Sequence, residues 1–154
     1  MNYQPQELKT IEDFNVGDKT SFTKTISESD VYQFAGITGD MASHHINKVF
    51  AKKSRFGQRV VQGMLTASLT TSPLSDLVAP GGLTVSHSFD FIAPVFIGDT
   101  IKASAEVIEK KTDKELLIVE LDCVNQDDKK VLEGTATELM KIEGPDKTNK
   151  GSNP

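Results

Sequence analysis

The chain has 154 residues, 37% of them apolar and 6% aromatic, which predicts one soluble domain with an aliphatic and Phe core. Its formal net charge of -5 argues against a protein that holds nucleic acid through phosphate contacts, because such domains are usually basic. No apolar run approaches the ~20 residues of a membrane span, and the start lacks a signal peptide's apolar core. We therefore expect a cytoplasmic protein with neither a nucleic-acid nor a membrane partner.

The N-terminal quarter of the chain predicts one strand followed by one helix. Residues 19–26 alternate between two faces, which is typical of an edge strand. Ser27 and Asp30 have the spacing of a capping box, so a first short helix is expected to begin there and to stop at Gly36. The residues that follow Gly36 are then expected to form a loop.

A second short helix is expected after this loop. Asn47 is a good N-cap for residues 48–54, and Val49 and Phe50 are the expected apolar anchors of this helix. Basic side chains crowd into the same dozen residues: Lys48, Lys52, Lys53, Arg55 and Arg59. They form either a solvated helix face or a landing site for the phosphate groups of a ligand.

The longest helical pattern covers residues 60–78. No charged residue occurs between Arg59 and Asp76, and a helix without a charged face is a buried one. Pro73 removes one backbone hydrogen bond and clashes with the preceding turn, so a break is expected near Ser72. This segment is the predicted central helix of the fold.

From Pro80 onward the hydrophobic period changes from helical to two. Polar turns separate four predicted strands, at residues 83–91, 100–109, 115–125 and 130–142. Helices first and hairpin-linked strands afterwards define an α+β class, in which one antiparallel sheet wraps around the central helix. A curved sheet with exposed edges favours pairing with a second copy, so we expect a homodimer or a dimer of dimers.

The expected domain covers residues 1–142. Its first ten residues are polar, without a clear period, and are expected to form an arm over the surface. Residues 143–154 contain no side chain suited to a packed core, so they are expected to be a disordered tail.

Asp40 and His45 place a carboxylate and an imidazole five positions apart, with small residues between them. Because His titrates near pH ~6.5, it is suited to move a proton at neutral pH, and a neighbouring ionised Asp stabilises the imidazolium. The plainer interpretation is that Asp40 caps a turn and His45 bonds the backbone. The adjacent His44 makes the register ambiguous.

The remaining His and Cys residues do not form a metal site. His87 lies on the apolar face of a predicted strand, which is typical of a core or interface histidine. Cys123, the only cysteine, occurs in a strand-like run and is expected to be a small core hydrophobe. Three His and one Cys at unrelated spacings give no pattern of metal ligands, and we expect no metal and no cofactor.

Four segments together resemble the MaoC-like (R)-specific enoyl-CoA hydratases and dehydratases of the hotdog fold: FAGITGD, HH, RVVQGMLTASL and FIAPVFIGDTI. The resemblance extends over most of the chain, from Phe14 to Met140. It implies a lyase of fatty acid metabolism that reversibly adds water, with syn stereochemistry, to trans-2-enoyl thioesters of coenzyme A or of an acyl carrier protein. It also implies a dimer with a pantetheine tunnel between its protomers.

The resemblance assigns roles to individual residues. The catalytic carboxylate and histidine of the family match Asp40 and His45, and spacing favours His45 over His44. The helix glycine that donates its N–H to the thioester carbonyl matches Gly63, and the preceding Gln62 is expected to donate a side-chain hydrogen bond at the same thioester site. Beyond the resemblance, we expect the basic group Lys52, Lys53, Arg55 and Arg59 to lie near the nucleotide end of the tunnel and to contact the phosphate groups of coenzyme A.

The chain departs from the family motif at its supporting positions. Ala42, Ser43 and Asn47 replace the Asn, Pro and final Asp of the motif, and Gln62 replaces a common His. We therefore expect the catalytic groups to be retained and their support to differ. Two alternatives remain from these residues, an acyl-CoA thioesterase and a non-catalytic acyl-thioester-binding protein of the same fold.

Overall fold

The computed structural model describes residues 7–141. The first six residues of the expected arm and the whole expected tail at 143–154 lie outside these residues. The described strands are β1 (Lys19–Thr25), β2 (Leu83–Phe91), β3 (Thr100–Lys111), β4 (Leu116–Val124) and β5 (Lys130–Leu139). The described helices are α1 (Glu28–Thr38), α2 (Ser43–Ile46), α3 (Lys48–Lys53), α4 (Gly63–Ser68) and α5 (Thr71–Val78), with single 3-10 turns at Ile11–Asp13 and Thr112–Lys114.

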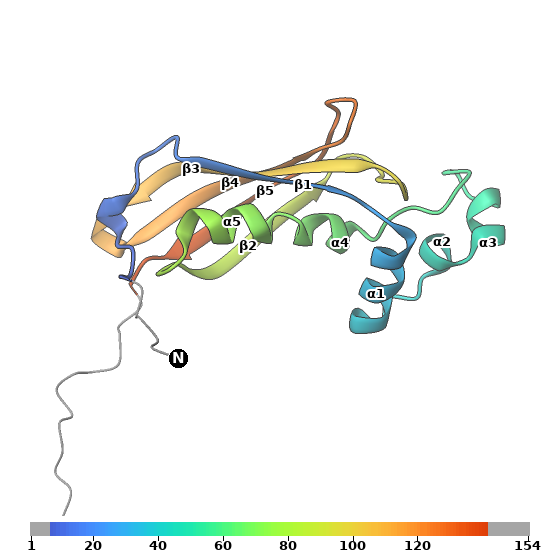
Figure 1. The fold of residues 1–154 in the computed structure, drawn as a ribbon, viewed down its shortest axis with the longest axis horizontal. Coiled ribbons are helices and arrows are strands. Elements are labelled where there is room, and N and C mark those ends of the chain that lie inside the picture. Colours follow the sequence, from blue (N-terminus) through green and yellow to red (C-terminus); the bar gives the residue numbers. More distant parts are fainter. Residues whose placement is uncertain (1–6, 142–154) are drawn as a thin grey trace, which may run out of the picture.

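The five strands form one antiparallel sheet in the order β1-β3-β4-β5-β2. The sheet curves over α4 and α5, whereas α1, α2 and α3 extend beyond one end of it (Figure 1). The α+β class and the sheet wrapped around a central helical segment are confirmed, and so is β1 as an edge strand. Strand β2 is the opposite edge.

The core lies between the sheet and the α4–α5 segment. Alternate residues of β3 and β4 are fully buried, as a strand with one covered face requires: Ile101, Ala103, Ala105, Val107, Leu117, Val119, Leu121 and Cys123. Leu74 and Leu77 of α5 pack against this face. Each fully buried large aliphatic side chain contributes roughly 1.5–3 kcal/mol through the apolar surface it removes from water.

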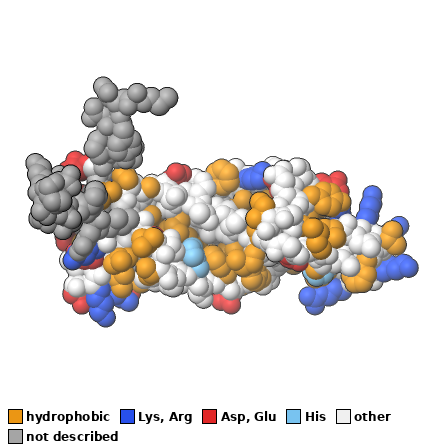
Figure 2. Space-filling view, turned by 90° about the horizontal axis from the view of Figure 1, so that it is seen from below, with side chains coloured by type: hydrophobic (Ala, Val, Ile, Leu, Met, Phe, Trp, Pro, Cys, Tyr) orange, Lys and Arg blue, Asp and Glu red, His pale blue; other side chains and the backbone are white. Residues whose placement is uncertain are grey.

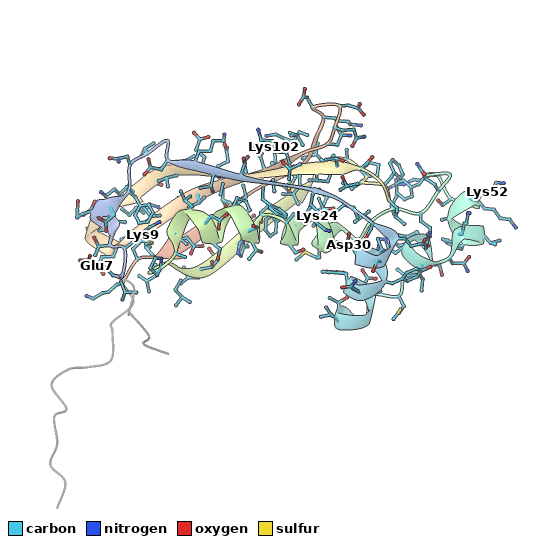
Figure 3. All side chains as sticks on the ribbon, viewed as in Figure 1. Glu7, Lys9, Lys24, Asp30, Lys52 and Lys102 are labelled. Atoms are coloured by element: carbon cyan, nitrogen blue, oxygen red, sulfur yellow. The ribbon has the colours of Figure 1, made fainter. Side chains whose placement is uncertain are left out.

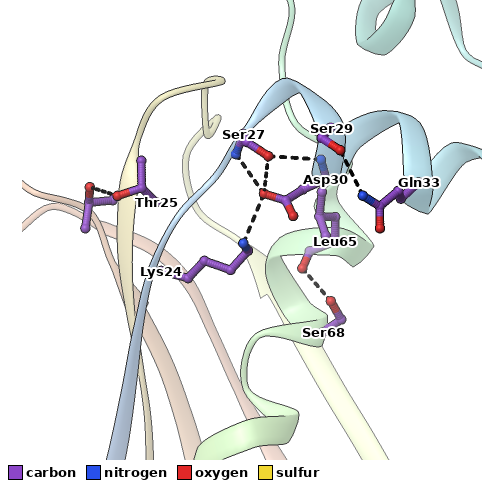
Figure 4. Close-up of polar contacts among 9 residues, drawn as sticks. Lys24, Thr25, Ser27, Ser29, Asp30, Gln33, Leu65 and Ser68 are labelled. Carbon is purple, nitrogen blue, oxygen red and sulfur yellow. Dashed lines mark hydrogen bonds and ion pairs between the residues drawn. The ribbon is translucent and has the colours of Figure 1, made fainter.

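The first turn of α1 is capped as expected and is tied to β1. Asp30 accepts hydrogen bonds from the N–H and the hydroxyl of Ser27, both at 2.7 Å, and Lys24 pairs with the same carboxylate at 3.1 Å (Figure 4). The predicted stop at Gly36 is wrong, because α1 continues to Thr38. It ends where Gly39, at φ +77°, adopts the left-handed conformation that a helix C-cap needs.

The predicted central helix is two short helices. The break falls at residues 69–70, between α4 and α5, rather than at Ser72. Pro73 is the third residue of α5, where the missing N–H costs little because the N–H groups of the first helical turn have no partner within the helix. Pro73 therefore lies in the first turn of α5, just after the break between α4 and α5.

Helix α3 begins at the expected cap but buries a different residue. The Asn47 side chain accepts the Phe50 N–H at 2.9 Å, which confirms the N-cap. The expected apolar anchors are wrong: Val49 is 71% exposed and Phe50 is 52% exposed, whereas Ala51 is fully buried. Among residues 7–141, no helix is long and apolar enough to cross a membrane.

Glu138 on β5 is a fully buried carboxyl group whose two oxygens accept no hydrogen bond from residues 7–141. Burial raises the pKa of Glu138 above its ordinary value of 4.5, and the nearby Thr84 hydroxyl only partly offsets this rise. A group with a raised folded-state pKa stabilises the fold fully below its unfolded pKa, and this stabilisation is lost as pH rises through the folded-state pKa.

We therefore expect Glu138→Gln to raise the free energy of unfolding by about 1–3 kcal/mol at pH 8 and to change it little at pH 4. Denaturant unfolding at both pH values measures this difference. Glu120→Gln, an exposed substitution on neighbouring β4, is the matched control and should have little effect at either pH. An equal effect of Glu138→Gln at both pH values would contradict the assignment.

Candidate active site

Asp40 and His45 lie close together at the end of the molecule where the helices project beyond the sheet. Asp40 follows the C-cap of α1, and His45 lies on α2, so the expected loop is correct for Asp40 and wrong for His45. His45 Nε2 is 3.7 Å from Asp40 Oδ2. The His45 side chain is only 9% exposed, whereas the Asp40 side chain is 43% exposed. The pair therefore has a buried imidazole and an accessible carboxylate.

A backbone carbonyl determines which nitrogen of His45 carries the proton. His45 Nδ1 lies 2.8 Å from the carbonyl oxygen of Val60. A carbonyl oxygen only accepts, so Nδ1 is the donor and, in the neutral ring, Nε2 carries the lone pair. The interpretation of His45 as a backbone-bonded histidine is therefore correct, and this bond leaves Nε2 directed at Asp40 as a base.

Two hydrogen bonds with residues two positions away in the sequence hold Asp40 in place. The Thr38 hydroxyl accepts the Asp40 N–H at 3.2 Å, and Asp40 Oδ1 accepts the Ala42 N–H at 3.4 Å, so the expected turn-capping role of Asp40 is present in weak form. Ala42 and Ser43 contribute only backbone groups to the bonds around α2, through Ala42 O to His45 N and Ser43 O to Asn47 N. The support for the pair is local and largely made by the backbone.

Residues 59–61 form a strap that fixes the position of His45. The Val60 N–H donates to His44 O at 3.1 Å, and the Val61 N–H donates to Val95 O at 2.8 Å. Both bonds hold the backbone around the carbonyl that binds His45 Nδ1.

The Arg59 side chain anchors this strap to α1. Its guanidinium donates to the Tyr32 hydroxyl at 2.9 Å and forms an ion pair with Glu28. The hydrogen bond from Arg59 lowers the pKa of Glu28 below its ordinary value. Because Glu28 already neutralises it, Arg59 is a weaker candidate for a ligand phosphate than the sequence predicts.

The remaining basic residues divide between two clefts. Lys48 and Lys52 border a groove of about 340 Å³ together with Gly57, Gln58, Arg59 and Ile97. Arg55 stacks over the Phe56 ring at 4.7 Å and borders a different cleft. Lys53 borders neither. Lysine and arginine side chains gather at the α3 end of the molecule, where Lys52 projects outward (Figures 2 and 3).

The second cleft, of about 270 Å³, contains the start of α4. Gly63 lies in it beneath Phe91: a Cβ on Gly63 would lie 2.9 Å from the Phe91 ring. Phe56, Ile92 and Val95 also line this cleft. Neither Phe56 nor Phe91 was expected at a site. Phe91 belongs to an alternating strand, in which a Phe is more often a core residue, and no motif marks Phe56. Asp40 and His45 do not line the cleft, so one protomer alone does not join the pair to Gly63 in a single cavity.

Gln62 is fully buried, and its amide Nε2 donates to the Val31 carbonyl at 3.1 Å. This bond uses one of the two amide hydrogens of Gln62, and its Oε1 has no partner among residues 7–141. Gln62 links α1, which leads to Asp40, with α4, which begins at Gly63. Gln62 therefore supports the site from within the protein, and its expected bond to the thioester stays a prediction.

The other sequence candidates lie away from this region. His87 is exposed on edge strand β2 and stacks on Phe89 at 5.2 Å, so a core histidine is excluded and an interface histidine stays a prediction. Cys123 is buried as expected, and burial raises the pKa of its thiol to about 12. No group of three His, Cys, Asp or Glu side chains within residues 7–141 is arranged to hold a metal ion.

Solved structures identify the class of the fold. The structure superposes with a TM-score of 0.79 on the unliganded R-hydratase from Pseudomonas aeruginosa, at 29% identity over 87% of this chain and 86% of that one. It superposes with a TM-score of 0.81 on the (R)-hydratase from A. caviae, at 28% identity over 84% of this chain and 99% of that one. The fold is therefore the hotdog fold of these hydratases.

Sequence comparisons identify the family. The model of the MaoC like domain matches residues 13–127. The chain is 37% identical to the (R)-specific enoyl-CoA hydratase of Rhodospirillum rubrum, over 89% of this chain and 95% of the relative. It is also 37% identical to the 3-hydroxybutyryl-CoA dehydratase of Methylorubrum extorquens, over 88% and 87% of the two chains. The chain belongs to the MaoC-like dehydratase family, as its sequence motifs predict.

Proposed function

We propose that this protein is an (R)-specific enoyl-CoA hydratase, or 3-hydroxyacyl-CoA dehydratase in the reverse direction, located in the cytoplasm. The observation that carries the proposal is the arrangement of His45, whose Nδ1 is fixed on Val60 O while Nε2 lies 3.7 Å from Asp40 Oδ2. Two relatives at 37% identity are named for these two directions of one reaction.

The gap between His45 and Asp40 suits a reacting water. At 3.7 Å the two groups are too far apart for a direct hydrogen bond. A water between them donates one hydrogen to Nε2 and the other to the carboxylate, which leaves an oxygen lone pair free to attack C3 of the enoyl thioester. His45 takes the water proton during this attack, and C2 receives a proton from the same nitrogen. Asp40 stabilises the imidazolium formed in between.

Negative charge that develops on the thioester oxygen needs a donor, and the proposed donor is the Gly63 N–H. Gly63 is the first residue of α4, so its N–H has no partner within the helix, and it has no side chain to obstruct an approaching carbonyl. Because α4 has only six residues, we attribute this role to the N–H itself and not to a helix dipole. A lost oxyanion donor of this kind typically costs about 3 kcal/mol in the transition state.

A second protomer would complete the site. Strand β2 is an edge, and apolar side chains on and beside it are each about half exposed: Met64, Leu83, Val85, Phe91 and Ile92. Hydrophobic side chains gather over this face of the molecule (Figure 2). An unpaired apolar edge favours pairing with another copy. Light scattering should give at least twice the 16.8 kDa mass of one chain.

The groove bordered by Lys48 and Lys52 is the proposed contact for the phosphate groups of coenzyme A. We expect Lys48→Glu combined with Lys52→Glu to raise KM for crotonyl-CoA by roughly tenfold, about 1.4 kcal/mol, because two favourable charge contacts become repulsive. KM for crotonyl-pantetheine, which lacks the nucleotide, should not change.

The matched control for these charge reversals is Lys102→Glu, an exposed lysine on the sheet, away from α3 (Figure 3). It should leave both KM values unchanged. Equal increases in KM for the two thioesters, or no increase for either, would contradict a phosphate contact at this groove.

Two readouts on crotonyl-CoA test the reaction. Loss of the enoyl-thioester absorbance without release of free thiol supports hydration, and detection of the 3-hydroxy product by chiral chromatography tests for the (R) configuration. Thiol release without hydration would instead indicate a thioesterase, and binding with neither reaction would indicate a non-catalytic acyl-thioester protein.

A further inference from the structure

His44 is a second imidazole at the candidate site, and the proposed reaction does not use it. The ring centroids of His44 and His45 are 4.0 Å apart, and the planes are tilted by 60°. The main-chain oxygen of His44 accepts the Val60 N–H at 3.1 Å, whereas His45 donates to the Val60 carbonyl. A single residue of the strap therefore fixes both histidines.

The contact with His44 is the one side-chain aromatic contact made by His45 among residues 7–141. The flanking residues Ala42 and Ser43 offer His45 no ring and no side-chain hydrogen bond in the described structure. The bond from Nδ1 to Val60 O fixes the position of the His45 ring but lets the ring tilt about that bond. The neighbouring His44 ring limits this tilt. The tilt determines where the Nε2 lone pair is directed relative to Asp40.

The charges around His44 come from few groups. Asp40 precedes α2, and His45 is the adjacent residue. Lys48, the first residue of α3, is exposed, and Arg59, beside Val60, is paired with Glu28. Burial and then the neighbouring His45 lower the pKa of His44 below its ordinary value of 6.5, and Asp40 opposes this effect. The lowered pKa favours the neutral form of the His44 ring at pH 7 and above.

We infer that His44 is a positioning residue for His45: its neutral ring fixes the tilt of the base and must stay uncharged for His45 to accept a proton. When Nε2 takes a proton from water, a neutral aromatic neighbour tolerates the new imidazolium. A protonated His44 would place a like charge at contact distance and oppose the same step. This inference deepens the proposed function and depends on it.

The pH dependence of kcat/KM for crotonyl-CoA hydration between pH 5 and pH 8 tests this role. In the wild type, a second imidazole that must stay neutral should make log kcat/KM fall by more than one unit per pH unit at the acidic end of this range. His44→Phe retains a ring but no titrating group, so its slope should not exceed one. Equal slopes for the two proteins would overturn the inference.

His44→Ala separates packing from charge. At pH 8 it should lower kcat by roughly tenfold with little change in KM, because the ring that limits the tilt of His45 is missing. His44→Phe should restore kcat to within about threefold of the wild type. Wild-type kcat in His44→Ala, or an equal loss in both variants, would overturn the positioning role.

An NMR titration of the histidine rings tests the pair without any turnover. The apparent pKa of His44 should rise in His45→Gln, because the neighbouring charge is removed, whereas that of the distant His87 should stay constant. An unchanged His44 titration would overturn the coupling. A His44 that titrates with His45 in a protein that does not hydrate crotonyl-CoA would contradict the proposed function and still support the pair.

Discussion

His45→Ala is expected to lower kcat for crotonyl-CoA hydration by about 10²- to 10⁴-fold, the range that a positioned general base typically contributes. KM should change little, because the imidazole acts on water rather than on the acyl chain. Asp40→Asn should reduce kcat within the same range, since an amide neither stabilises the imidazolium nor accepts from water as strongly as a carboxylate. Steady-state kinetics at pH 8 measures both effects.

The matched control for Asp40→Asn is Asp113→Asn, which removes an exposed carboxylate in the turn between β3 and β4. It should retain wild-type kcat. Circular dichroism and light scattering must show that all variants keep the fold and the assembly of the wild type. Folded His45→Ala and Asp40→Asn proteins with wild-type rates would remove both residues from the reaction.

Gly134→Ala is expected to destabilise the protein more than any other substitution that adds one methyl group to a strand of the sheet. Gly134 lies on β5 opposite Phe89 of β2. A Cβ at this position would lie 2.2 Å from the Ser88 carbonyl oxygen and 2.8 Å from the Phe89 ring. Because the first of these atoms is backbone, β2 would have to move, and the free energy of unfolding should fall by about 2–3 kcal/mol.

Denaturant unfolding measures this loss, and Gly36→Ala provides a matched control. Gly36 lies inside α1 with no atom within 4 Å of the added Cβ, so this substitution should raise stability by up to about 1 kcal/mol through helix propensity. A Gly134→Ala protein as stable as the wild type would show that β2 shifts from β5 without cost.

The sequence was sufficient for the elements whose signals are local. The strand at residues 83–91, the capping box at Ser27 and the N-cap at Asn47 all depend on neighbours within a few positions, and all three are confirmed. The alternation within 83–91 does not appear as alternating burial, because every residue of β2 except Phe89 is exposed. Helix ends were less predictable. Gly36 costs a helix only about 1 kcal/mol, so α1 continues past it to Gly39, where the backbone needs a positive φ.

The support of the candidate site depends on contacts between distant residues, which spacing does not reveal. Arg59 resembled a free cation because Glu28, its partner in the structure, lies 31 positions earlier. The carbonyl that orients His45 belongs to Val60, and every residue has a carbonyl, so no residue type marks it. The sequence therefore predicted the carboxylate and the imidazole that lie together but not the contacts that hold them.

In the proposed reaction, the bond between His45 and Val60 also constrains how protons move. With its Nδ1–H donated to a carbonyl oxygen, neutral His45 has its lone pair on Nε2, which is the nitrogen that can accept a proton. The proton that leaves water and the proton that reaches C2 then pass through the same atom, from the same side of the substrate. Because each step must be reversible along its own path, dehydration begins with Nε2 removing that proton again. One peptide oxygen thus commits both directions of the reaction to one face.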